Sequence, residues 1–120
     1  MAKSNKTSKA DFEAFKKTVV YWQNKLGLTD WKLYLSHDTV ENTLAWVRRD
    51  NEGRCASIGL SVNWEHQKVS RKLINECALH EVLHILLANL RYAGQQRQTT
   101  ETDFSIAEHE IIRRLEKVLK

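Results

Sequence analysis

The stretch from His80 to Leu90 carries apolar side chains on nearly every side of the helix that it is expected to form. The apolar residues are Val82, Leu83, Ile85, Leu86, Leu87 and Leu90. A helix that is apolar all round is a buried helix. Burying His80, Glu81 and His84 in it is costly unless these groups are paired or bind a metal ion. The chain is therefore predicted to fold around one buried helix that holds a polar site.

The polar residues of this helix form an HExxH motif. His80 and His84, four residues apart, project from one helix face and can share a metal ion through their imidazole nitrogens. Glu81 lies beside that face, where a carboxylate can take a proton from a metal-bound water. A surface helix with two solvated histidines is the alternative, and the apolar surroundings argue against it. We predict His80 and His84 as metal ligands and Glu81 as the catalytic residue.

A catalytic zinc ion usually has three protein ligands, so one ligand is missing from the motif. The metzincin class is excluded because Leu87 and Leu90 occupy the positions of its conserved glycine and third histidine. Glu108 is the predicted third ligand. At helical spacing it falls near the centre of an apolar face formed by Ala107, Ile111, Ile112 and Leu115. His109, at the margin of that face, is the alternative ligand.

The pattern of the chain predicts one α+β domain over residues 9–120, preceded by a disordered basic tail over residues 1–8. A helix is expected from Ser8 to Gly27, followed by three strands near residues 31–36, 44–47 and 56–62. The motif helix should run from about Arg71 to Tyr92, and a last helix should follow a cap at Thr100. In the third strand Ser57, Gly59 and Ser61 form a face of small residues that leaves room near the backbone.

The composition narrows the class of protein further. With 42% hydrophobic and 28% charged residues, the chain is typical of a globular protein. It contains no apolar run of membrane-spanning length and no hydrophobic signal core, so we expect a cytoplasmic protein without a membrane partner. The net charge of +4 is modest, and we therefore do not expect nucleic acid as a partner.

The motif His80-Glu81-Val82-Leu83-His84, followed by Glu108 and preceded by the strand at 56–62, resembles a minimal gluzincin. The similarity is to small phage-encoded metallopeptidases, and more distantly to ImmA/IrrE- and SprT-like zincins. It implies a zincin-like fold with zinc as the metal, in the host cytoplasm if the chain is phage-encoded. It also implies that residues 56–62 form an edge strand along which Ser57, Gly59 and Ser61 bind the substrate. In one departure, Ile112 stands where the gluzincin pattern has an acid.

The expected function is a monomeric zinc metallopeptidase that hydrolyses a peptide or protein substrate, with Glu81 as general base. A transition-state donor could be His66, Tyr92 or His109, and the sequence does not distinguish them. Two alternatives belong to other classes. One is an inactive zincin that binds a partner protein, and the other is a nucleic-acid-associated module anchored by its basic tail.

Overall fold

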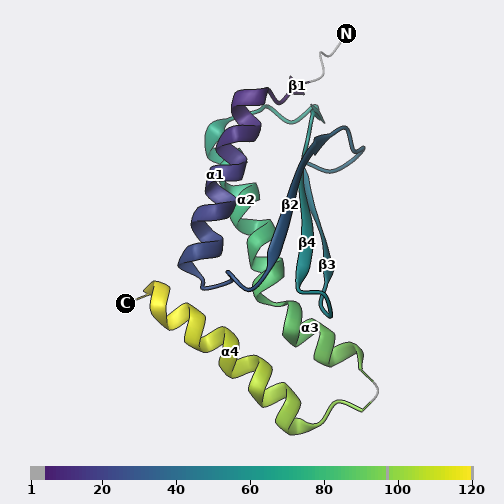
Figure 1. Cartoon of the computed structure of the whole chain (residues 1–120). Helices are drawn as coiled ribbons and strands as arrows, with labels where there is room; N and C mark the ends of the chain where they lie inside the picture. The colour runs from purple at the N-terminus through teal and green to yellow at the C-terminus, as the bar shows by residue number, and fades with distance from the viewer. Residues whose placement is uncertain (1–4, 97, 120) are drawn as a thin grey trace.

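A computed structural model describes residues 5–96 and 98–119. The elements are, in order, β1 (Asn5–Lys6), α1 (Lys9–Lys25), β2 (Lys32–Asp38), β3 (Ala45–Asp50), β4 (Cys55–Ser61), β5 (Asn63–Glu65), α2 (Arg71–Leu86), α3 (Ala88–Gln95) and α4 (Glu101–Leu119). Helices α1 and α2 lie side by side on one face of a small sheet, and α3 and α4 extend beyond its lower end (Figure 1). The predicted α+β class is confirmed.

Both ends of helix α1 are set by residues close to them in the sequence. The Ser8 hydroxyl accepts a hydrogen bond from the Asp11 amide, and the Asp11 carboxylate accepts one from the Ser8 amide, which forms a capping box. Gly27 adopts a φ of +68°, in the left-handed region that suits a residue following a helix. Phe15 and Val19 on the inner face of α1 are fully buried. The predicted helix from Ser8 to Gly27 is confirmed.

The main sheet has the strand order β2-β4-β3, so that β4 lies in the middle. It pairs in parallel with β2 and antiparallel with β3. The predicted three-stranded sheet is confirmed, but the prediction that residues 56–62 form an edge strand is wrong. Both sides of β4 are occupied by ladder hydrogen bonds, which leaves no backbone edge for a substrate. Among the described residues, the edges of this sheet are β2 and β3.

The core lies between this sheet and the pair α1 and α2. Ala56, Ile58 and Leu60 alternate along β4 and are buried against the helices. Residues of β2 and β3 that pair with them in register, including Leu33 and Val47, pack on the same side. The described helices leave the opposite face of the sheet open, with Tyr34 and Ser57 exposed on it.

The predicted continuous helix from Arg71 to Tyr92 is instead two helices. Helix α2 ends at Leu86 and α3 begins at Ala88, with a bend of 46° between them. The bend brings Asn89 into a polar network, where its amide donates to Glu110 of α4 at 2.7 Å and accepts from Arg54 at 2.8 Å. These hydrogen bonds give α3 a direction that helical periodicity alone does not specify.

No single helix within residues 5–96 and 98–119 has the length and apolar character needed to span a membrane. In this described part of the chain, α2 and α3 reach that length and composition only when taken together across their bend.

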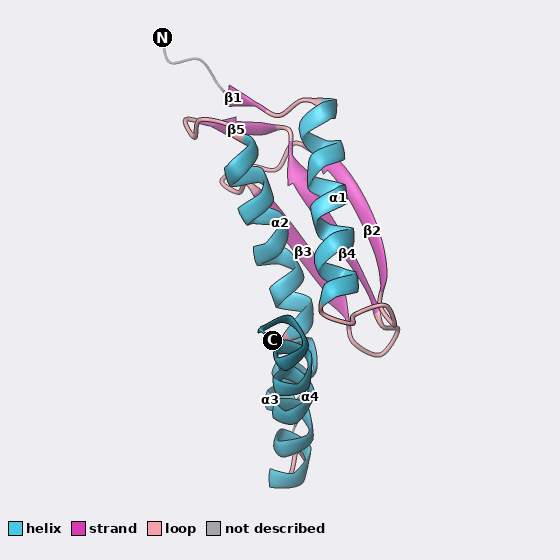
Figure 2. Ribbon diagram, turned by 90° about the vertical axis from the view of Figure 1, so that its left-hand side faces the viewer, coloured by secondary structure: helices cyan, strands magenta, loops and turns pink. Residues whose placement is uncertain are grey.

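The segment from Asn5 to Ser8 forms a short strand and the cap of α1. Strand β1 pairs antiparallel with β5, and Figure 2 shows this two-stranded ribbon at the end of the molecule where α2 begins. Thr7 is buried, and its hydroxyl hydrogen-bonds to the Ser61 carbonyl at 2.7 Å. The predicted disordered tail is therefore wrong for residues 5–8, because strand pairing and this hydrogen bond fix them. Residues 1–4 lie outside the described part of the chain.

Candidate metal centre

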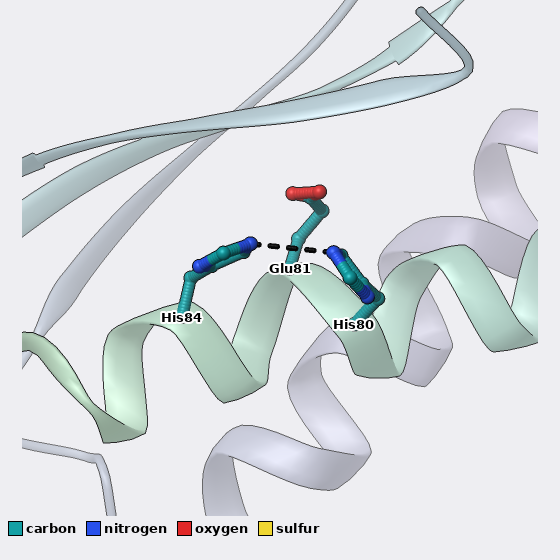
Figure 3. Close-up of side chains that lie close together, drawn as sticks. All are labelled: His80, Glu81 and His84. Atoms are coloured by element: carbon teal, nitrogen blue, oxygen red, sulfur yellow. Dashed lines mark hydrogen bonds between the residues drawn. The ribbon is translucent and has the colours of Figure 1, made fainter.

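Helix α2 positions the two predicted histidine ligands. Its start is capped by the Ser70 hydroxyl, which accepts from the Leu73 amide at 3.1 Å. One turn separates His80 from His84, and their Nε2 atoms lie 3.3 Å apart (Figure 3). The imidazole rings meet edge to face, with an interplanar angle of 78°. Two ring nitrogens thus converge on one point above the helix.

Glu81 points from the same helix toward the sheet (Figure 3). Its side chain is buried, and its Oε2 atom has no hydrogen-bond partner among the residues that the structure describes. Burial raises the pKa of this carboxyl, while the positive charges of His80 and Arg49 act in the opposite direction. A buried carboxylate without a partner is costly, so this group is suited to bind a cation or to take up a proton.

His84 is held by β3 as well as by its own helix. The Arg49 guanidinium donates from Nη1 to the His84 backbone carbonyl at 2.9 Å. Burial lowers the pKa of His84, and the positive charges of His80, Arg49 and Arg91 lower it further. The neutral imidazole that results is the form that binds a metal ion.

One nitrogen of each histidine and one oxygen of Glu81 lie within 4.8 Å of one another and could hold a metal ion. The other predicted ligands are not part of this group. Glu108 is exposed on α4, and the prediction that it lies near the centre of the packed face is wrong. That face is formed by Ala107, Ile111 and Leu115. His109 is also exposed, with its Nδ1 atom 2.7 Å from the Ser105 carbonyl oxygen.

The predicted substrate-binding residues of β4 do not face the motif. Ser57 is exposed on the open face of the sheet. A Cβ atom on Gly59 would lie 1.9 Å from Trp46 Cζ2, so the indole occupies the space beside this glycine. Ser61 is fully buried, and the carbonyl oxygens of Val40 and Asn63 lie 3.2 Å and 3.1 Å from its hydroxyl, which can donate to either one. The small side chains of β4 therefore accommodate neighbouring protein groups.

Strand β3 lies beside the motif instead. It packs on α2 and runs in the same direction, with Ala45 near His80 and Arg49 at His84. A cavity of about 350 Å³ opens at the His80 end, between residues 43–45 and one face of α2 formed by Leu73, Glu76, Cys77, His80 and Glu81. A second cavity of about 430 Å³ opens beyond His84, between residues 47–52 and α3. The outer edge of β3 pairs with no described strand.

Arg49 is a site residue that the sequence analysis missed. Its position in β3 could have indicated it, because Ala45, Val47 and Arg49 alternate and share the helix-facing side. A charged residue on the inward side of a strand needs a partner there. Among the candidate transition-state donors, Tyr92 donates its hydroxyl to Glu52 at 3.2 Å and lines the larger cavity, while His66 and His109 are exposed.

Comparison of the chain with protein-family models, with curated proteins and with solved structures finds no match.

Proposed function

We propose that this protein is a zinc-dependent metallopeptidase whose centre is formed by His80, Glu81 and His84. The observation that carries the proposal is the convergence of two imidazole nitrogens beside a buried carboxylate oxygen that has no partner. The two imidazole nitrogens fit a zinc ion at a site with an open position, and Glu81 lies beside that site. When bound, zinc would polarise a carbonyl and acidify a water molecule.

Glu81 supplies the acid–base chemistry in this proposal. Burial favours the protonated form of its carboxyl, so the carboxylate has a strong tendency to accept a proton from water and pass it to a leaving amine. The neighbouring positive charges of His80 and Arg49 partly offset the rise in the pKa of Glu81. A carboxyl balanced in this way suits a group that must be ionised at rest and protonated during turnover.

The free edge of β3 provides the place for an extended substrate. A peptide that adds to this edge would pair with backbone amides and carbonyls of residues 45–50 and lie along the motif helix. This mode of binding makes few demands on side chains, which suits a peptidase. We therefore propose β3, in place of residues 56–62, as the strand that pairs with the substrate.

Glu108 remains our proposed third ligand, with His109 as the alternative. Both are exposed on α4, which packs on α3 and is joined to it by the Asn89–Glu110 hydrogen bond. Ligation by either residue requires a placement of α4 over α2 that differs from the one observed. Water or substrate would otherwise complete the coordination of the two histidines.

Native mass spectrometry of the full chain tests the metal centre. We expect one zinc ion per chain, which His80→Ala removes. Glu108→Ala or His109→Ala then identifies the third ligand by the loss of zinc. Exposed Glu41 provides a matched control, and Glu41→Ala should retain the metal.

Cleavage of unstructured protein substrates should require zinc and should disappear in Glu81→Gln while zinc remains. A wild-type chain that takes up no zinc after reconstitution overturns the proposal.

A further inference from the structure

The larger cavity, beyond His84, has two arginines on facing walls. Arg49 comes from β3, and Arg91 comes from α3, seven residues after His84. The hydrogen bond from Arg49 to the His84 carbonyl anchors the first guanidinium at the edge of the metal centre. Arg91 is exposed, with its side chain at the cavity. Two guanidinium groups therefore border the space that begins where the two-histidine site ends.

Neither of these arginines forms an ion pair within the described ranges 5–96 and 98–119. The arginines that do so are Arg54, Arg71 and Arg114. Two acidic residues also line the cavity, and each accepts a hydrogen bond from a neutral donor. Asp50 accepts from the Gly53 amide at 3.1 Å, and Glu52 accepts from the Tyr92 hydroxyl at 3.2 Å. Among the described residues, neither guanidinium is thus paired directly with a carboxylate, and Glu81 is the acidic group whose charge acts on Arg49.

The two ends of the cleft differ in chemistry. At the His80 end the smaller cavity is lined by Leu44, Leu73 and Cys77, with Glu76 as a second carboxylate beside Glu81. A carboxylate on a ligand would be repelled there. At the His84 end the two guanidiniums offer planar sets of N–H donors, which match the geometry of a carboxylate. The two cavities therefore differ in that only the one at the His84 end offers guanidinium donors to a ligand.

We propose that Arg49 and Arg91 bind a carboxylate of the substrate on the His84 side of the metal centre. This inference rests on the proposed peptidase function for the identity of the ligand as a peptide. The carboxylate is either that of an aspartate or glutamate side chain or that of a free peptide C-terminus, since both present the same two oxygens.

Binding to the metal-free full chain tests this assignment without any need for turnover. Three short peptides of one neutral sequence are compared by isothermal titration calorimetry: one capped at both ends, one capped but with a single glutamate, and one with a free C-terminal carboxylate. We expect at least one carboxylate peptide to bind about tenfold more tightly than the neutral peptide, and added salt to weaken this preference. Whichever carboxylate peptide is preferred identifies the source.

Arg91→Met should abolish the preference, and Arg91→Lys should retain part of it because the charge remains without the planar fork. Arg48→Met is the matched control, because Arg48 is exposed on the opposite face of the same strand. Equal binding of all three peptides, including no binding at millimolar concentration, overturns the inference, as does a preference that survives in Arg91→Met. Zinc content is measured separately, so failure of the metal centre is distinguished from failure of the carboxylate site.

Discussion

The Nε2 atoms of His80 and His84 lie 3.3 Å apart on one face of α2, with the Arg49 guanidinium bonded to the backbone of the second histidine. Burial and the neighbouring positive groups lower the pKa of His84 below its ordinary value of 6.5. His84 therefore stays neutral at a lower pH than a solvent-exposed histidine does, and protons compete less with a metal ion for it.

From this relationship we predict that protonation of His84 weakens zinc binding only at pH values below 6.5, its ordinary pKa, as the solution is acidified from neutrality. Arg91→Met should move the decline to higher pH, because removing a positive charge near His84 lets its pKa rise. Competition with a chromogenic chelator across the pH range measures the effect. A decline that begins well above pH 6.5 in the wild type would contradict the lowered pKa of His84.

Glu81→Gln should stabilise the metal-free protein at neutral pH by about 1 kcal/mol, because it replaces a buried carboxylate that lacks one partner. Burial raises the pKa of Glu81 in the folded state above its ordinary value of 4.5, so the folded chain holds this proton more tightly. Stability is therefore lost as pH rises through the folded-state pKa, and the amide removes that loss. Urea unfolding of the two proteins checks this result.

The control for this comparison is Glu76→Gln, an exposed position on the same helix, for which no comparable gain is expected. A decrease in stability for Glu81→Gln would show that the carboxylate has a partner which its geometry does not reveal.

His37 should make the fold sensitive to acid. Its ring stacks on Phe12 with centroids 4.9 Å apart, and its Nε2 atom lies 2.7 Å from the Thr7 hydroxyl. Burial lowers the pKa of His37 below 6.5, so the unfolded chain takes up a proton before the folded chain does. Stability is thus lost as pH falls below 6.5.

In His37→Gln this pH dependence of unfolding should weaken, measured by urea denaturation at several pH values. His66→Gln, in the exposed loop after β5, should leave the pH dependence of the wild type intact. Identical pH profiles for wild type and His37→Gln would assign the acid sensitivity to other groups.

Gly59→Ala should destabilise the sheet by about 2 kcal/mol, because the added methyl group would overlap the Trp46 indole. Trp46→Leu in the same chain should recover part of this loss by opening the space. Gly94→Ala is the matched control, since a Cβ atom there meets nothing within 4 Å and alanine favours the helix. Thermal unfolding of the three variants and the wild type would reject this packing if Gly59→Ala proved neutral.

Asn89→Ala should loosen the connection between α3 and α4. The side chain donates to Glu110 and accepts from Asn51 and Arg54, so its loss should cost about 2 kcal/mol. Hydrogen exchange resolved by residue should show faster exchange in α3 and α4, with little change in α1. Uniform acceleration across the whole chain would contradict a local role for this residue.

The elements themselves could largely be predicted from local sequence. Ser8, Ser70 and Thr100 mark helix starts through hydrogen bonds to nearby amides, and Gly27 marks a helix end through its positive φ. The HExxH motif likewise places its three side chains together, because helical spacing alone does so. These features depend on neighbours within one helical turn.

What depends on distant partners could not be predicted in the same way. The run at 56–62 alternates small and apolar residues, and such a run fits an edge strand or a central one until its neighbours are known. The apolar residues of the last helix can be grouped into two adjacent faces. Glu108 lies near the centre of only one of these faces. Packing selects Ala107 and Leu115, which leaves Phe104 and Ile112 exposed.

The central position of β4 also sets the order in which the sheet can assemble. Strands β2 and β3 do not pair with each other, so β2 remains without a partner until the chain has been extended through Ser61. The hairpin of β3 and β4 closes through a short turn and can form early, whereas the parallel pairing of β2 joins residues more than 20 positions apart, such as Lys32 and Cys55. A nascent chain that stops before β4 therefore holds two of its three main strands and no sheet.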